Sequence, residues 1–135
     1  MLFRCLGIAY ESEPRVTVKF YPDETFAYQF GNTFLGFHHG HRLKPDVMAG
    51  VCADRYNKMY GNTQFRYLHS GHIHHDNVKD LWGGFRWHSH RTMAPKDWYA
   101  HSHGYITRQS MKAYIYNDKE GEVGNPTASL IAKGE

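Results

Sequence analysis

The sequence is poor in cysteine: it has two, Cys5 and Cys52, in 135 residues. Two widely separated cysteines cannot build the disulfide framework of a small secreted domain. We therefore expect two reduced, buried thiols rather than a disulfide. No apolar run approaches the roughly 20 residues that a membrane-spanning helix needs, and the N-terminus lacks the features of a secretory signal. These absences predict a soluble, cytoplasmic protein with no membrane partner.

Neither sign of charge dominates, since 16 Lys and Arg stand against 13 Asp and Glu, for a net charge of +3. This balance permits a nucleic-acid partner but does not predict one, because basic binding domains carry stronger, clustered charge. Low-complexity runs are absent and 41% of the residues are hydrophobic, which excludes extensive disorder. We expect a single domain over residues 1–123 and a flexible tail over 124–135.

Hydrophobic periodicity predicts a sheet with few helices. Strands are predicted over residues 16–20, 26–30, 33–37, 65–69, 84–88 and 111–116, and a helix over residues 44–60. The first two strands are expected to form a hairpin. The helix begins with Pro45 and Asp46, which suit a first turn, and its apolar stripe is expected to pack in the core. The pattern predicts a mixed α/β or α+β fold.

Histidine is the residue in marked excess, with eleven in the chain, all between His38 and His103. Two groups directly follow predicted buried strands: His-His-Gly-His over residues 38–41 and Gly-His-Ile-His over 71–74. Two strands joined by one helix can lie parallel, which places their carboxyl ends at the same sheet edge. An extended His-x-His directs both rings to one side. This arrangement favours a metal site over unliganded loop histidines.

The stretch from about Tyr21 to Gly121 resembles the C-terminal half of calcineurin-like metallophosphoesterases. The segments YQFGNTFLGFHHGHRLKP, YLHSGHIHHD and HRTMAPKDWYAHSHGYITRQSMKAYIY follow the order found in a phage and bacterial subgroup, whose members are labelled as DNA-repair exonucleases or phosphoesterases. The resemblance implies a truncated αββα sandwich, a phage origin and a location in the cytoplasm of the host cell.

The resemblance also implies three metal ligands and assigns no catalytic residue. His39 matches the ligand of the family's His-Gly motif, and His72 the first ligand of its Gly-His-x-His motif, both on the second metal. His74 matches the second ligand of that motif, on the first metal. The implied cofactor is a divalent ion such as Mn or Zn. Further residues expected near the site are His41, Arg91 and Asp97.

The carboxylate motifs of the family are absent: no Asp-x-His precedes His38, and no Gly-Asp or Gly-Asn-His occurs in the chain. A dinuclear site holds two cations about 3.5–4 Å apart, usually with a bridging carboxylate. Three neutral imidazoles supply neither that bridge nor the charge. One ion held by three histidines and water is chemically feasible. A nearby carboxylate is available from Asp76, Asp80 or Asp97.

Aromatic residues make up 16% of the chain and alternate with Arg and Lys in its second half. Such a mixture suits base stacking, phosphate contact or a protein interface. An ordinary aromatic core with a solvated basic rim explains it equally well. The candidate interface residues are Trp82, Arg86, Trp87, Trp98 and Tyr99.

Three functions follow from these observations. We favour a non-catalytic or catalytically impaired metallophosphoesterase-like protein that binds a protein or nucleoprotein target. An inhibitor of a host nucleic-acid-targeting defence belongs to this class. A homodimer is the alternative partner, since it would also cover exposed apolar surface. The second is a metal-dependent phosphodiesterase or nuclease, completed by dimerisation or by a partner. The third is a domain fragment with no activity of its own.

Overall fold

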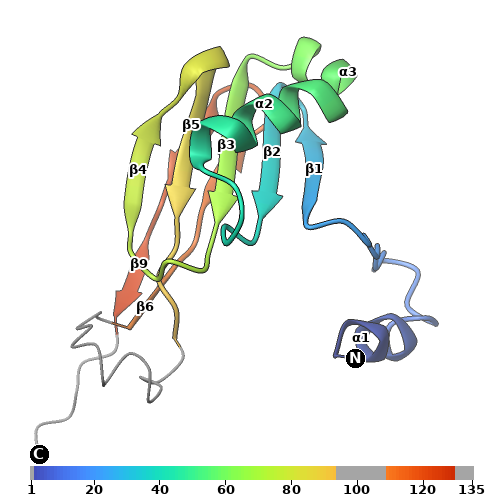
Figure 1. Ribbon diagram of the computed structural model, residues 1–135. Coiled ribbons are helices and arrows are strands. Elements are labelled where there is room, and N and C mark those ends of the chain that lie inside the picture. The colour runs from blue at the N-terminus through green and yellow to red at the C-terminus, as the bar shows by residue number, and fades with distance from the viewer. Residues whose placement is uncertain (1, 94–108, 130–135) are drawn as a thin grey trace, which may run out of the picture.

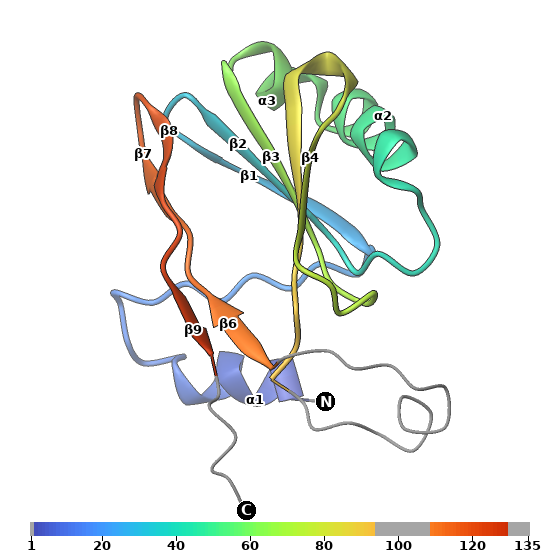
Figure 2. The ribbon, with the colours of Figure 1, turned by 90° about the vertical axis from the view of Figure 1, so that its left-hand side faces the viewer.

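The computed structural model describes residues 2–93 and 109–129. A five-stranded sheet lies between α2 and α3 on one face and a ribbon of short strands, β6 to β9, on the other (Figures 1 and 2). In chain order, the elements are α1 Leu2–Ala9, β1 Thr25–Phe30, β2 Thr33–His38, α2 Pro45–Arg55, α3 Asn57–Gly61, β3 Phe65–Ser70, β4 Asn77–Asp80, η1 Trp82–Gly84, β5 Phe85–Ser89, β6 Ser110–Lys112, β7 Ile115–Asn117, β8 Gly121–Gly124 and β9 Thr127–Ser129. No helix in this part of the chain is long and apolar enough to span a membrane.

The sheet has the strand order β1-β2-β3-β5-β4. Its three central strands, β2, β3 and β5, run parallel, and the two edge strands are antiparallel to their neighbours. The prediction of a mixed sheet with few helices is confirmed, as are the buried strands over residues 33–37, 65–69 and 84–88. Because the two helices connect β2 to β3, those strands are parallel, and the carboxyl end of β2 lies beside that of β3.

The predicted hairpin between residues 16–20 and 26–30 is wrong. Residues 16–20 form no strand, and β1 pairs instead with β2 across the turn Gly31-Asn32. Gly31 has a φ of 53°, a conformation that favours glycine. A Cβ at this position would collide with Asp118. Turn chemistry of this kind, between two apolar strands, outweighs the weaker alternation of residues 16–20.

The predicted helix over residues 44–60 is divided at Tyr56, whose φ of −116° and ψ of 37° end α2 before α3 begins. The Tyr56 hydroxyl donates to the Thr25 carbonyl at 2.9 Å. The apolar stripe of the predicted helix packs in the core as expected at Met48 and Cys52, whereas Val47 is 51% exposed. The buried core comprises Ala27, Phe34, Met48, Ala49, Cys52, Leu68, Leu81, Phe85 and Trp87.

Several short elements differ from the sequence-based expectation. The strand predicted over residues 111–116 is divided into β6 and β7, and β4 lies in a segment expected to be a loop. Thr127–Ser129 pairs with β6 and so belongs to a sheet rather than to the expected tail. The sequence pattern does not predict the N-terminal helix α1. Cys5 is exposed rather than buried, Cys52 is buried, and no disulfide joins them.

Candidate functional site

The structure brings the two histidine groups together at the carboxyl ends of β2 and β3. His38 and Ser70 are Cα partners at the ends of these strands. Beyond them, the ring centroids of His39 and His72 are 5.0 Å apart, and that of His41 lies 5.0 Å from His39 and 5.8 Å from His72. We call His39, His41 and His72 the histidine edge.

Gly40 allows the two loops of the histidine edge to approach. Its φ is 99°, in the region that L side chains rarely adopt. A Cβ at Gly40 would lie 2.9 Å from the Gly71 carbonyl oxygen. The Gly71 N–H in turn donates to the His39 carbonyl at 3.2 Å. Glycine is therefore required here by backbone conformation and by close approach together.

The expected extended His-x-His conformation is wrong. His72 and His74 both have positive φ, 65° and 54°, and the Ile73 N–H donates to the Gly71 carbonyl at 2.8 Å. The chain therefore turns tightly where an extended segment was predicted. Among the described residues, the rings in contact with His72 are those of His39 and His41. The structure does not bring His74 into this ring cluster.

A carboxylate that the sequence reasoning missed faces the histidine edge. Because Thr25 pairs with His38, Glu24 lies beside the end of β2. Glu24 Oε1 is 3.7 Å from His41 Nε2 and 3.4 Å from Arg42 Nη1. The predicted hairpin between residues 16–20 and 26–30 does not pair β1 with β2, and so it does not place Glu24 beside the end of β2. Correct pairing of β1 with β2, signalled by Gly31-Asn32, would have revealed it.

His38 is the buried residue of this site, and its side chain is 1% exposed. The Gly40 N–H donates to His38 Nδ1 at 2.8 Å, so the proton of the neutral ring lies on Nε2, which faces Glu24 Oε2 at 3.9 Å. Burial lowers the pKa of His38, although Glu24 opposes that effect. The ring is therefore neutral, and its orientation is fixed by a backbone donor.

A cavity of about 270 Å³ opens beside the histidine edge, at the N-terminus of α2. His41, Arg42 and Lys44 contribute the basic part of its lining, and its apolar part includes the buried side chains of Met48 and Trp87. The complete lining is Gly40, His41, Arg42, Leu43, Lys44, Pro45, Met48, Ser70, Gly71, Ile73 and Trp87. Such a surface can hold an anionic group next to an apolar one.

The other residues predicted near the site have separate positions. Arg91 is exposed and lines a smaller cavity of about 130 Å³ with His90 and Lys112. Asp76 pairs with Lys112 at 2.7 Å, and Asp80 pairs with Arg86 at 2.9 Å. Both carboxylates are thus engaged by cations. Three predicted residues, Asp97, Trp98 and Tyr99, lie outside the described residues.

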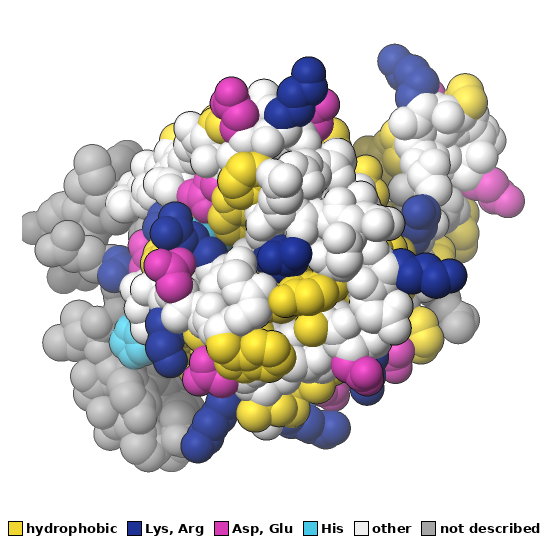
Figure 3. Space-filling view, turned by 90° about the horizontal axis from the view of Figure 1, so that it is seen from above, with side chains coloured by type: hydrophobic (Ala, Val, Ile, Leu, Met, Phe, Trp, Pro, Cys, Tyr) yellow, Lys and Arg dark blue, Asp and Glu magenta, His cyan; other side chains and the backbone are white. Residues whose placement is uncertain are grey.

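Two residues of the predicted interface lie at the surface, and a third lies in the core. Trp82 is 57% exposed and Arg86 is exposed. Trp87 is only 6% exposed, belongs to the core and donates from Nε1 to Ser70 Oγ at 2.8 Å, so its assignment to an exposed surface is corrected. Over the helices, hydrophobic side chains lie among charges of both signs (Figure 3).

The histidine edge lacks a complete set of metal ligands among the described residues. In residues 2–93 and 109–129, no group of three or more His, Cys, Asp or Glu side chains is placed to hold one. The nearby donors are imidazoles and one carboxylate that already faces Arg42. As placed, these residues do not fit a resident ion. The ligand set of His39, His72 and His74 stays a prediction.

A second histidine cluster lies on the ribbon face of the sheet and was not singled out from the sequence. It consists of His69, His88 and His90, which we call the buried histidine cluster. The His69 ring stacks within 5.2 Å of both others. Burial lowers the pKa of all three, that of His69 to about 3. Tyr114 and Tyr116 from the ribbon cover these rings.

Comparison with known proteins found no matching family and no matching curated protein. Among solved structures, wild-type Vps29 from Entamoeba histolytica complexed with Zn²⁺ is 16% identical, with a TM-score of 0.50, over 82% of this chain and 63% of that one. A single mutant of that protein is 15% identical, with a TM-score of 0.49, over 86% and 67%. The chain thus spans about two thirds of the length of these structures. At this identity the likeness shows the fold alone, and Vps29 has a metallophosphoesterase fold.

Proposed function

We propose that this chain is a metallophosphoesterase-like protein, non-catalytic or catalytically impaired, that binds a nucleoprotein target through phosphate groups. The observation that carries the proposal is the cavity beside the histidine edge, with its basic and apolar lining. Its position, outside the carboxyl ends of parallel strands, is where ligands collect in sheets of this kind.

The donors around this cavity suit phosphate. Arg42 and Lys44 supply positive charge, and the N-terminus of the eleven-residue helix α2 adds a partial positive charge. Ser70 Oγ accepts from Trp87 Nε1, which leaves its hydroxyl hydrogen available to donate. The apolar lining accommodates a base or a side chain attached to the phosphate.

Binding of a labelled single-stranded oligonucleotide, followed by fluorescence anisotropy at low salt, tests the proposal. The double variant Arg42→Gln, Lys44→Gln should bind roughly tenfold more weakly, because each lost phosphate contact is worth about 0.5–1 kcal/mol at an exposed site. The matched control is the double variant Arg55→Gln, Lys58→Gln, which removes two exposed charges away from the cavity, at the far end of α2 and in α3. No binding by the wild type, or an equal loss in the control, contradicts the proposal and leaves a purely protein target.

A metal-dependent phosphodiesterase or nuclease is the second candidate, favoured by the three converging histidines and by the Zn²⁺ complex of a protein of like fold. Its missing ligands would come from a second copy or a partner. The test is metal content together with hydrolysis of a generic phosphodiester, in the wild type and in the double variant His39→Ala, His72→Ala. Stoichiometric Mn or Zn and turnover lost in the variant would establish this alternative.

Inhibition of a host nucleic-acid-targeting defence, in the host cytoplasm, is the finer form of the first proposal and is supported by the resemblance of the sequence to phage proteins. Co-purification of the tagged chain with host nucleoprotein complexes, followed by an assay of their targeting activity, tests it. Recovery of such a complex by the wild type but not by the double variant Arg42→Gln, Lys44→Gln is the expected result.

A further inference from the structure

The two edge strands of the sheet present different surfaces. At one edge, β4 is four residues long and carries Lys79 and Asp80, paired with Asp46 and Arg86. Short, charged edges of this kind resist pairing with another strand. At the other edge, β1 has six residues and no charge. Within the described part of the chain, the sheet pairs β1 on one side only, with β2, and β1 is therefore open to a further strand.

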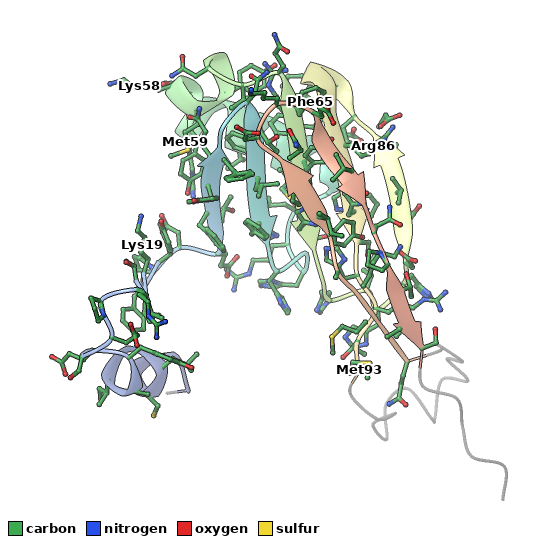
Figure 4. The ribbon with its side chains drawn as sticks, turned by 180° about the vertical axis from the view of Figure 1, so that it is seen from behind. Lys19, Lys58, Met59, Phe65, Arg86 and Met93 are labelled. Atoms are coloured by element: carbon green, nitrogen blue, oxygen red, sulfur yellow. The ribbon has the colours of Figure 1, made fainter. Side chains whose placement is uncertain are left out.

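Two aromatic side chains of β1 remain exposed. Tyr28 is 52% exposed and Phe30 is 40% exposed. They lie on the same face as Phe26, because alternate residues of a strand share a face. The ribbon crosses in front of β3 and β5 on this face, while β1 and β2 lie to one side of it (Figure 4). An uncharged open edge therefore borders an uncovered aromatic surface.

A row of stacked rings crosses the same face of the sheet. Neighbouring rings in the row are 4.6–5.3 Å apart and within 22° of parallel, in the order Tyr21, Phe26, Phe37, His69 and His88. Tyr21 therefore already fills the place beyond Phe26 that a ring from another strand would take. On this face of β1, the aromatic residues available to a further strand are Tyr28 and Phe30.

We propose that β1 is a self-association edge, at which two copies of this chain pair their β1 strands antiparallel about a two-fold axis at Gln29. The Tyr28 ring of each copy then packs against the Phe30 ring of the other. The inference is independent of the proposed function, because it uses neither the histidine edge nor its cavity.

The register follows from the faces of the strand. A two-fold axis perpendicular to the sheet keeps each face on its own side, so each residue must pair with one of its own face. An axis at Tyr28 would place Phe30 of one copy opposite Phe26 of the other, where Tyr21 already stacks. An axis at Gln29 pairs Tyr28 with Phe30 and leaves that stack intact. Aromatic cross-strand pairs of this kind stabilise antiparallel sheets.

The backbone of β1 fits this register. The Thr25 carbonyl accepts from the Tyr56 hydroxyl at 2.9 Å, which is consistent with a carbonyl directed away from β2. Backbone direction alternates along an antiparallel strand, so Ala27 and Gln29 direct their N–H and C=O groups to the same open side. At the axis, the two Gln29 residues exchange both backbone hydrogen bonds. The side-chain amide of Gln29 already donates to the Gly31 carbonyl at 3.0 Å.

Molar mass measured by light scattering across a concentration series tests the interface. The wild type should approach twice the chain mass, whereas Tyr28→Lys should stay at one chain mass. The matched control is Val78→Lys on β4, a residue opposite His88 and 50% exposed, which should behave as the wild type. A monomeric wild type overturns the proposal. So does association that survives Tyr28→Lys or is lost in Val78→Lys.

Crosslinking tests the register and does not depend on the lysine variants. In a Cys5→Ser background, Gln29→Cys places two thiols across the axis, so mild oxidation should give a covalent dimer. Val78→Cys in the same background should give none, and adding Tyr28→Lys to Gln29→Cys should abolish the product. Circular dichroism confirms that each variant is folded. Equal crosslinking at positions 29 and 78, or none at 29, overturns the proposed register.

Discussion

Nδ1 of His69 lies 2.9 Å from Nε2 of His90, so at most one proton lies between these two part-buried imidazoles. The other nitrogen of His69, Nε2, is 2.7 Å from the Tyr116 hydroxyl. His69 thus uses both ring nitrogens in contacts that join the residue following β5, His90, and strand β7, through Tyr116, to the central strand β3. Charging His69 and His90 together would place two cations in contact in a buried site, so the neutral forms hold this region together.

The protein is expected to lose stability as the pH falls below about 6.5, the ordinary pKa of histidine. The folded-state pKa of His69 is lowered to about 3, first by burial and then by His90 and His88. The folded state therefore binds fewer protons than the unfolded chain between these values, and the stabilisation present above pH 6.5 is lost on acidification. His69 alone contributes a loss of about 2 kcal/mol between pH 7.5 and pH 5. Urea unfolding at the two pH values measures it.

A His69→Phe variant provides the control, because phenylalanine retains the ring stack with Phe37 and His88 but cannot titrate. This variant should be less stable than the wild type at pH 7.5, since the hydrogen bonds of His69 are lost. Its stability should nevertheless fall less on acidification. An unchanged pH dependence would show that the acid sensitivity arises elsewhere.

Substitution of Trp87 should lower stability more than substitution of Trp82. Trp87→Phe removes the buried donor to Ser70 Oγ and is expected to lower the free energy of unfolding by about 1–2 kcal/mol. Trp82→Phe also removes a donor, from Trp82 Nε1 to the Asp46 carbonyl at 3.2 Å. Because that side chain is 57% exposed and water can replace the lost partner, the variant should stay within about 0.5 kcal/mol of the wild type. Urea unfolding compares the two. A larger loss at Trp82 would contradict the core position assigned to Trp87.

The parts of the fold that the sequence predicts are those fixed by local pattern. The apolar runs over residues 33–37 and 65–69, joined by a helical segment, predict two buried parallel strands, and parallel pairing brings their carboxyl ends together. The convergence of His39 with His72 follows from that topology. No side-chain detail is needed to reach it.

The remainder depends on relationships between distant segments. Glu24 joins the site only because β1 pairs with β2, and the helix is divided at Tyr56, whose hydroxyl contacts β1. The sequence does not predict the turn at His72 and His74, because residue types alone do not show that both adopt a positive φ. The buried histidine cluster depends on the ribbon, whose short strands have little hydrophobic periodicity of their own.

Gly40→Ala should separate the two loops of the histidine edge. The new Cβ would lie 2.9 Å from the Gly71 carbonyl oxygen at a φ of 99°, which costs about 1–3 kcal/mol of strain. Oligonucleotide affinity should fall along with stability. The control is Gly61→Ala, since among the described residues a Cβ there would meet no atom within 4 Å apart from its chain neighbours and its own helix backbone. Equal effects of the two substitutions would show that close approach at Gly40 is not required.

Glu24→Gln separates the two candidate functions by the sign of its effect. Glu24 is the carboxylate that faces His41 and Arg42, so its neutralisation frees positive charge for phosphate. Because the pair is half exposed, the gain is about 0.5–1 kcal/mol, or two- to fivefold tighter oligonucleotide binding. A metal-dependent phosphodiesterase that used Glu24 as a ligand would instead lose bound metal and turnover.

Asp23→Asn is the matched control, because it makes the same change in net charge at the neighbouring exposed residue. If both variants bind oligonucleotide equally tightly, overall charge rather than the local pair explains the gain. Weaker binding by Glu24→Gln would contradict phosphate recognition at this edge.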